Sequence, residues 1–198
     1  MNPLLWINGP FGVGKTQTAH ELARRLPGSF VCDPEHLGFG IQRMTPPELR
    51  GDFQDLPLWR EGVYRLLDRS LTHSGRVVIV PMTLVVPAYF EEIVERLRGD
   101  GHTVHHVALL ASRETLLRRL RSRGEGAGSW GAGQIDRCLA GLGSLDEADH
   151  LPTDSLTLEE VVAEIARRAG LDLVPDRTHP LTRPLRRWAV HLRHLRRD

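Results

Sequence analysis

Lysine is almost absent from this sequence, because Lys15 stands alone against 25 arginines in 198 residues. The two side chains carry the same charge, but arginine ends in a broad planar head and lysine in a compact ammonium group on a long stem. A chain that uses arginine for its other positive charges therefore has a specific need for the narrower head at position 15.

Cysteine is also scarce, and the two residues present, Cys32 and Cys138, lie far apart. No Cys-x-x-Cys pair or Cys/His spacing of a zinc site occurs, so we interpret both as free thiols. No stretch approaches the roughly 18 to 20 apolar residues of a membrane-spanning helix, and no basic leader precedes an apolar run. We expect a soluble cytoplasmic protein.

The net charge of the whole chain is only +1, which gives no indication of a nucleic-acid partner. Residues 176–198, however, contain seven arginines against two aspartates, and their apolar residues share one helical stripe. We expect this basic amphipathic helix either to pack on the domain or to bind the inner face of an anionic membrane peripherally. A nucleic-acid or protein partner for this helix is the remaining alternative. The stripe consists of Leu185, Trp188, Leu192 and Leu195.

Five short apolar runs rich in β-forming residues alternate with helical or loop-like stretches. This alternation predicts an α/β three-layer sandwich over residues 1–175, with a mostly parallel sheet between helices on both faces. One or two inserted helices are expected between the second and third strands, in residues 38–75. Half of residues 124–133 are glycine, too many for this stretch to hold a fixed shape alone. The expected strands are residues 4–7, 29–32, 76–80, 103–110 and 148–151.

The sequence GPFGVGKT, residues 9–16, matches the phosphate-binding pattern G-x-x-x-x-G-K-[ST] between an expected strand and an expected helix. Its glycines let backbone N–H groups point at phosphate oxygens, and the helix start adds unsatisfied amides. Lys15 would reach the β and γ phosphates of ATP, and the Thr16 hydroxyl would bind Mg²⁺. A glycine turn that merely caps a helix is the alternative. The expected ATP-binding residues are Gly9, Gly12, Val13, Gly14, Lys15, Thr16 and Gln17.

The second expected strand ends in VCDPEHLG, which puts Asp33 at the carboxyl edge of the sheet beside the phosphate loop. A carboxylate there can accept the proton of an attacking hydroxyl or hold Mg²⁺ through water. Glu35 is a second candidate in the same turn. Alternatively, both residues only shape the turn around Pro34.

Arginines flank the glycine-rich stretch on both sides. Arg119 and Arg123 are four residues apart, so they share a helix face that leads into this stretch. Permanent charges at the base of a flexible lid suit phosphoryl transfer, because charge that develops on the transferred group must be neutralised. Arg137, beyond the lid, is a further candidate. A solvated helix face in an arginine-rich protein is the alternative.

The order of these parts resembles the nucleoside monophosphate kinase-like group of P-loop proteins, which includes shikimate, gluconate and adenylate kinases. More narrowly, INGPFGVGKT, CDPEHLGF and VVIVPMTL are similar to the tunicamycin resistance proteins of bacteria, and the resemblance covers residues 3–175. It implies a five-stranded parallel sheet, an ATP site at the P-loop, and an acceptor pocket with a lid at 124–133. The third strand departs from many P-loop enzymes, because it ends in Thr83 where they place an aspartate for Mg²⁺. Thr16, with Asp33 through water, would then hold the metal.

The inserted segment contains Phe53, Trp59 and Tyr64 among charged residues, which suits a polar acceptor with a flat or sugar-like portion. Core packing is the alternative for Trp59 and Tyr64. The resemblance suggests a hydroxyl-bearing nucleoside or glycoside as acceptor, tunicamycin included. The expected acceptor-binding residues are Asp33, Glu35, Trp59 and Thr83.

We therefore expect an ATP- and Mg²⁺-dependent phosphotransferase that acts on a hydroxyl of a small molecule. One alternative is an ATP-binding protein that sequesters its ligand without modifying it, and another is a housekeeping nucleotide or metabolite kinase. The expected catalytic residues are Lys15, Asp33, Arg119, Arg123 and Arg137.

Overall fold

The computed structural model describes residues 2–126, 128–145 and 149–176. The predicted amphipathic helix lies outside these residues, so its membrane contact stays a prediction from sequence. Five parallel strands form one sheet in the order β2-β3-β1-β4-β5, which confirms the predicted α/β architecture. The strands are β1 (Leu4–Asn8), β2 (Phe30–Val31), β3 (Val78–Pro81), β4 (Val104–Leu110) and β5 (Asp149–Pro152).

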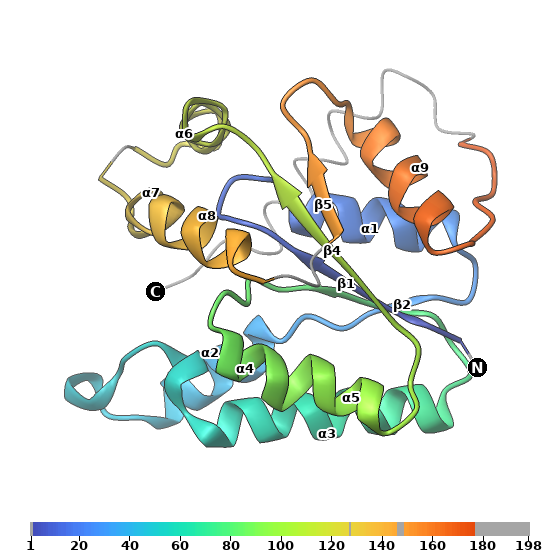
Figure 1. Ribbon diagram of the computed structural model, residues 1–198. Coiled ribbons are helices and arrows are strands. Elements are labelled where there is room, and N and C mark those ends of the chain that lie inside the picture. The colour runs from blue at the N-terminus through green and yellow to red at the C-terminus, as the bar shows by residue number, and fades with distance from the viewer. Residues whose placement is uncertain (1, 127, 146–148, 177–198) are drawn as a thin grey trace.

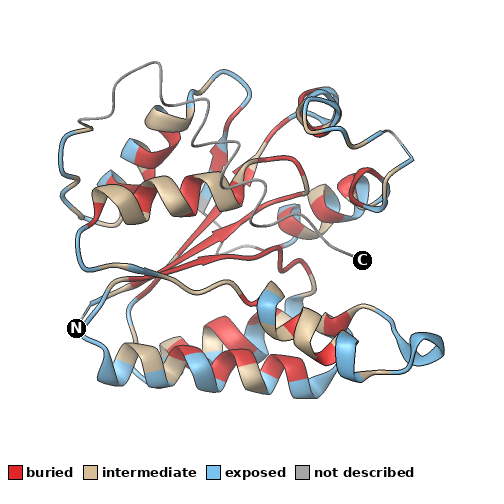
Figure 2. Cartoon of the chain, turned by 180° about the vertical axis from the view of Figure 1, so that it is seen from behind, coloured by how far each residue is buried: buried red, intermediate tan, exposed pale blue. Residues whose placement is uncertain are grey.

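The central strand β1 supplies both hydrophobic cores of the molecule. Side chains alternate between the two faces of a strand, so Leu4 and Trp6 enter one core whereas Leu5 and Ile7 enter the other. All four are at most 1% exposed. Burial on both faces explains why this strand is a continuous apolar run rather than an alternating one, and Figure 2 shows the strands buried between partly exposed helices.

Helices cover both faces of the sheet (Figure 1). One face packs against α3 (Pro57–His73) and the continuous segment α4 (Pro87–Phe90), η3 (Glu91–Glu95) and α5 (Arg96–Gly99). The other packs against α1 (Lys15–Arg25) and α9 (Leu158–Arg168). Among the described residues, no helix combines the length and apolar character needed to cross a bilayer. The remaining helices are α2 (Glu35–Met44), η1 (Pro47–Leu49), η2 (Phe53–Asp55), α6 (Arg113–Arg121), α7 (Trp130–Gly133) and α8 (Ile135–Gly143).

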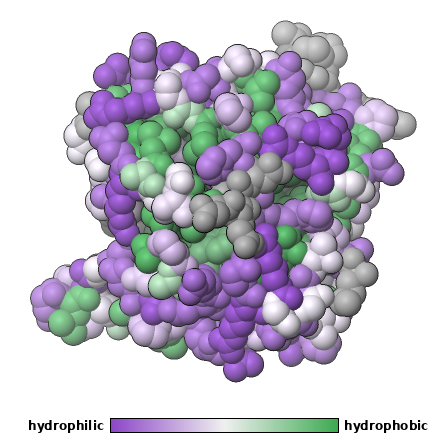
Figure 3. Space-filling model, in the orientation of Figure 1, coloured by the Kyte–Doolittle hydropathy of each residue, from purple (hydrophilic) through white to green (hydrophobic). Residues whose placement is uncertain are grey.

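The segment between β2 and β3 contains α2, the two short turns η1 and η2, and α3. Its outer loop projects from the body of the molecule, at the lower left in Figures 1 and 3. Met44 and Leu49, at the end of α2 and in η1, are 81% and 71% exposed. Trp59 and Tyr64 of α3 are buried instead, so core packing is the correct interpretation of both aromatic rings.

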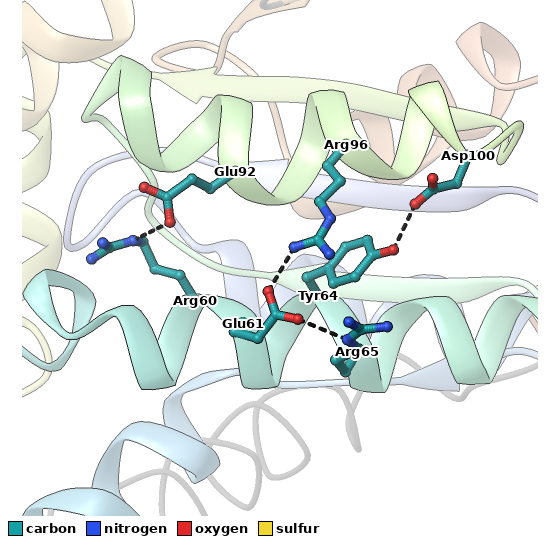
Figure 4. A network of polar contacts seen from close by, with 7 residues as sticks. All are labelled: Arg60, Glu61, Tyr64, Arg65, Glu92, Arg96 and Asp100. Atoms are coloured by element: carbon teal, nitrogen blue, oxygen red, sulfur yellow. Dashed lines mark hydrogen bonds and ion pairs between the residues drawn. The ribbon is translucent and has the colours of Figure 1, made fainter.

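Polar contacts join α3 to the α4–η3–α5 segment along its length (Figure 4). Tyr64 donates a hydrogen bond from its hydroxyl to Asp100 Oδ2 at 2.7 Å, and the guanidinium of Arg96 lies 3.6 Å from the centre of the Tyr64 ring. Arg96 also donates to Glu61 Oε2 at 2.6 Å. These contacts hold α3 and the α4–η3–α5 segment together on one face of the sheet.

The second half of the glycine-rich stretch, residues 124–133, has regular structure, because residues 130–133 form α7. The Ser129 hydroxyl accepts a hydrogen bond from the Ala132 N–H and caps this short helix. The Trp130 ring then packs edge-on against Phe11 of the loop after β1, with 5.0 Å between ring centres. Tertiary packing therefore supplies the order that the local sequence lacks.

Candidate functional site

The loop that follows β1 needs glycine at several positions. Gly9, Gly12 and Gly14 have φ values of +146°, +83° and +107°, and residues with a side chain rarely adopt such angles. A Cβ at Gly9 would lie 2.6 Å from the Leu109 carbonyl oxygen, and one at Gly12 would lie 2.9 Å from Leu120 Cγ. Both backbone conformation and close packing therefore exclude other residues from the first two positions.

Lys15 folds its ammonium group back across this loop. Its Nζ donates to the Gly9 carbonyl at 3.0 Å and to the Pro10 carbonyl at 3.2 Å, and the side chain is buried. Burial lowers the pKa of Lys15 from 10.5 to about 8, although the nearby carboxylates of Glu35 and Asp33 oppose this effect. The compact ammonium group of the chain's single lysine fits inside the loop, as the composition of the sequence suggested.

Asn8 and Thr83 fasten the loop to the end of β3. Asn8 is fully buried; its Nδ2 donates to the Leu84 carbonyl at 2.7 Å, and its Oδ1 accepts from the N–H groups of Gly9 and Leu84. The Thr83 hydroxyl donates to the Gly9 carbonyl at 2.8 Å. Sequence reasoning missed Asn8, although a polar residue at the end of an apolar strand was a usable signal.

The prediction that Thr83 binds the acceptor does not match its surroundings. Thr83 is 5% exposed, and its hydroxyl is already bonded to Gly9. Trp59 is a second predicted acceptor contact. It is 0% exposed, and its indole N–H donates to the Pro34 carbonyl at 3.1 Å. The polar groups of both side chains are therefore buried and bonded within the protein, and their contact with an acceptor stays a prediction from sequence.

The turn after β2 brings two carboxylates to the Lys15 side of the sheet edge. Asp33 Oδ1 accepts from the backbone N–H of Glu35 at 3.0 Å, so Asp33 does shape the turn around Pro34. The charges of Asp33 and Glu35 nevertheless act on Lys15, as its pKa reflects. Asp33 can therefore both shape the turn and act through its charge on Lys15.

Arg119 and Arg123 line the same pocket as Gly12, Val13 and Gly14 of the loop. Arg119 of α6 donates to the Val13 carbonyl at 3.3 Å and to the Thr153 carbonyl at 2.7 Å, which joins the loop to the segment after β5. Burial lowers the pKa of both arginines. Arg123 lies in the turn beyond α6 rather than on the helix. Its positive charge repels that of Lys15 and so contributes to lowering the pKa of Lys15.

A pocket of about 480 Å³ opens between the loop, the end of α6 and the segment that joins β5 to α9. Its size and its mixture of apolar walls with a few polar groups are typical of small-molecule sites. Six predicted residues line it, but the contribution of residues 153–161 was missed, because nothing in their sequence differs from an ordinary helix start. The lining residues are Gly12, Val13, Gly14, Gln17, Thr18, Arg119, Ser122, Arg123, Thr153, Leu156, Thr157, Leu158, Glu159 and Val161.

Arg137 does not join the other two arginines. It lies on α8 and turns toward the inserted segment, with its Nη1 3.8 Å from Asp52 Oδ2 and its side chain half exposed. The expected cluster of three arginines is therefore divided, because α8 passes the loop on the side of the insertion. Cys138, the next residue of α8, is buried. Burial raises its pKa, whereas the charges of Lys15 and Arg137 lower it in part.

The donor set around the loop fits Mg²⁺ brought in by phosphates, which needs few ligands from the protein. Within the described ranges, no group of three or more His, Cys, Asp or Glu side chains could hold a metal. Mg²⁺ in such sites keeps several waters and takes one or two oxygen ligands besides phosphate. The Thr16 hydroxyl in the first turn of α1 and the Asp33 carboxylate are oxygen donors of this kind.

Comparisons with known proteins identify the fold and the family. Residues 4–145 match the family model of an AAA domain. The tunicamycin resistance protein of Deinococcus radiodurans is 36% identical, with a TM-score of 0.75 over 88% of this chain and 99% of that chain. No curated protein sequence matched.

Two kinases share the fold at lower identity. A gluconokinase from Sinorhizobium meliloti 1021 is 19% identical, with a TM-score of 0.61 over 85% of this chain and 94% of that one. A shikimate kinase from Bacteroides thetaiotaomicron is 20% identical, with a TM-score of 0.55 over 85% of this chain and 99% of that one. The chain therefore belongs to the AAA-domain family, is similar to the Deinococcus tunicamycin resistance protein, and shares its fold with the two kinases.

Proposed function

We propose that this protein is an ATP-dependent phosphotransferase that moves the γ-phosphoryl group of ATP to a hydroxyl of a small molecule. The observation that carries the proposal is the position of Lys15, whose ammonium group lies across the glycine loop and donates to the Gly9 and Pro10 carbonyls. The negative charges of Glu35 and Asp33 and the positive charge of Arg123 all act on this group. A phosphate site between a candidate base and permanent cations is what phosphoryl transfer requires. Tunicamycin, named in a 36% identical relative, is the first acceptor to test.

ATP would bind along the P-loop. The backbone amides of the loop and Lys15 would hold the β and γ phosphates, because they combine inward-pointing donors with the start of α1. The pocket of about 480 Å³ beside Arg119 would take the nucleoside. The Thr16 hydroxyl, and Asp33 through water, would hold Mg²⁺, which neutralises charge on the phosphates when bound.

Asp33 is the proposed general base. The acceptor oxygen attacks the γ phosphorus while its proton passes to the Asp33 carboxylate, and the bond to the β-phosphate oxygen breaks with its electron pair leaving on ADP. Lys15 and Arg123 would neutralise the charge on the transferred group. Glu35 is the competing base, because it lies in the same turn and its charge also acts on Lys15.

Mass spectrometry of tunicamycin and a panel of small hydroxyl compounds, after incubation with protein, ATP and Mg²⁺, tests the proposal. We expect one added phosphoryl group on an acceptor, and none with Lys15→Ala. Asp33→Asn should lower kcat by about 10²- to 10⁴-fold, a much larger effect than its effect on ATP affinity. A similar loss in Glu35→Gln, with Asp33→Asn active, would instead assign the base to Glu35.

A second candidate function follows from the end of β3. Thr83 occupies the position where many P-loop enzymes carry an aspartate for Mg²⁺, and it is bonded to the loop. A protein that binds ATP and sequesters its ligand without chemistry would tolerate this change. In that case wild-type protein would bind ATP and leave every acceptor unmodified, and Asp33→Asn would protect cells from tunicamycin as well as wild type.

A further inference from the structure

A buried histidine contacts the residue that precedes the P-loop. His106 lies on β4, where its Cα pairs with that of Trp6, and it is only 3% exposed. Residues two apart on a strand share a face, so His106 lies on the same face of the sheet as Asn8, diagonally across from it. Its Nε2 is 3.1 Å from Asn8 Nδ2, and its ring packs edge-on against Phe90 with 4.8 Å between ring centres. The imidazole is thereby held beside the Asn8 amide.

The hydrogen bonds of Asn8 determine which of its atoms faces the histidine. Asn8 Oδ1 accepts from the backbone N–H groups of Gly9 at 2.8 Å and Leu84 at 2.9 Å, which assigns the amide oxygen to that side. Asn8 Nδ2 then donates one hydrogen to the Leu84 carbonyl at 2.7 Å and the other to His106 Nε2. An imidazole nitrogen accepts a hydrogen bond only when it carries no proton, so the proton of His106 is on Nδ1.

His106 completes the hydrogen bonding of the Asn8 amide. An amide side chain has two hydrogens and two acceptor sites, and all four of those of Asn8 are used. Such an amide cannot rotate without leaving a buried polar group unbonded, which is costly in the protein interior. Asn8 binds the N–H of Gly9, and the Gly9 carbonyl accepts from Lys15 Nζ at 3.0 Å. A continuous set of buried bonds therefore connects His106 to the lysine of the phosphate loop.

We infer that His106 is a positioning residue of the P-loop: neutral, with its proton on Nδ1, it holds the Asn8 amide and through it the backbone at Gly9. The inference rests on the nucleotide site of the proposed function and not on phosphoryl transfer. Core packing alone, which the contact with Phe90 would satisfy, requires the shape of the ring but no acceptor at Nε2. Variants that keep or remove the acceptor therefore separate the two roles.

The tautomer is measured first, by long-range ¹H–¹⁵N NMR of the wild-type protein without nucleotide at a pH slightly above neutral. We expect an unprotonated Nε2 and a protonated Nδ1 on His106. A proton on Nε2, or on both ring nitrogens, overturns the inference. This result does not depend on whether the protein transfers a phosphoryl group.

Two substitutions of His106 then separate the acceptor from the ring. His106→Met removes the acceptor, so AMP-PNP affinity, measured by calorimetry with Mg²⁺, should fall about five- to tenfold, the effect of one lost buried hydrogen bond. His106→Gln can still accept from Asn8 through Oε1 and should stay within about twofold of wild type. His105→Met is the matched control, because His105 pairs with Leu5 and its side chain lies on the other face of the sheet. It should leave nucleotide affinity unchanged.

Amide hydrogen exchange shows whether the effect reaches the loop through Asn8. We expect faster exchange at the Gly9 and Leu84 N–H groups in His106→Met but not in His105→Met, because Asn8 Oδ1 accepts from both groups. Faster exchange across the whole sheet, or equal affinity losses in the two variants of His106, would show a packing role only and contradict the assignment. If wild-type protein does not bind AMP-PNP, the proposed function fails, and the tautomer and the exchange rates still decide this inference.

Discussion

At the scale of single residues, Lys15 is the group on which burial and the neighbouring charges of the site act together. Its ammonium group is buried against two loop carbonyls, and burial outweighs the two carboxylates, so its pKa falls to about 8. A lysine at this pKa changes charge near physiological pH. The charge that would hold the phosphates is therefore more sensitive to pH than that of an exposed lysine.

We predict that AMP-PNP affinity is nearly constant below pH 7 and weakens by up to about tenfold per pH unit above pH 8, because phosphate binds the charged amine. Calorimetry across this range measures it, and Lys15→Met should bind weakly with a flat profile. The free protein should show the opposite sign in stability. Between pH 8 and 10.5 the unfolded chain binds the proton more strongly, so the unfolding free energy of wild type relative to Lys15→Met should rise. A pH-independent wild-type affinity would contradict the lowered pKa.

At the scale of elements, the ends of β1 and β3 are joined into one support for the P-loop. The Gly9 carbonyl accepts from Lys15 Nζ and from the Thr83 hydroxyl, and the Thr83 carbonyl accepts from Gln54 Nε2 at 3.0 Å. The insertion thus reaches the loop through η2 and the end of β3. We therefore expect a substitution at Thr83 to change the nucleotide affinity of the loop more than the stability of the fold.

Thr83→Val keeps the shape of the side chain but removes the hydroxyl donor. We expect it to weaken AMP-PNP binding about five- to tenfold, because the loop loses one buried hydrogen bond worth about 1 kcal/mol. Thr45→Val is the matched control, since the Thr45 hydroxyl makes a similar bond to the Ile41 carbonyl in α2, away from the loop. Equal affinity losses in the two variants would show that Thr83 has no particular role.

At the scale of the whole molecule, the site is assembled from distant parts of the chain. The P-loop follows β1, the carboxylates follow β2, and Arg119 joins α6 to Thr153 after β5. Nucleotide bound between these parts should hold them together. Binding to the folded state alone raises stability by about 2.7 kcal/mol at a ligand concentration one hundred times Kd.

AMP-PNP with Mg²⁺ should therefore raise the Tm of the wild-type protein, and Arg119→Ala should show a clearly smaller rise. Arg118→Ala is the neighbouring control, because Arg118 bonds to Thr115 of its own helix and does not line the pocket. Differential scanning fluorimetry at matched nucleotide concentrations measures both shifts. A full shift in Arg119→Ala would remove Arg119 from the nucleotide site.

Local patterns were sufficient for the strands and for the loop that binds phosphate. Apolar runs predicted the five parallel strands within a few residues. Burial on both faces of the sheet explains the continuous apolar runs of β1 and β3. The loop glycines were readable because positive φ angles and close packing leave glycine as the only choice. The roles of Trp59 and Thr83 were not readable, since burial depends on what the remaining chain packs against them.

By itself, the sequence determined the α/β class, the phosphate loop with its single lysine, and the turn that carries Asp33, because each depends on neighbours within a few residues. Only the tertiary structure decided that Asn8 and Thr83 fasten the loop, that Arg137 departs from Arg119, and that α7 is ordered by Phe11. Those outcomes depend on contacts between residues far apart in the chain. Which face a side chain meets is set by the packing of whole elements rather than by local pattern.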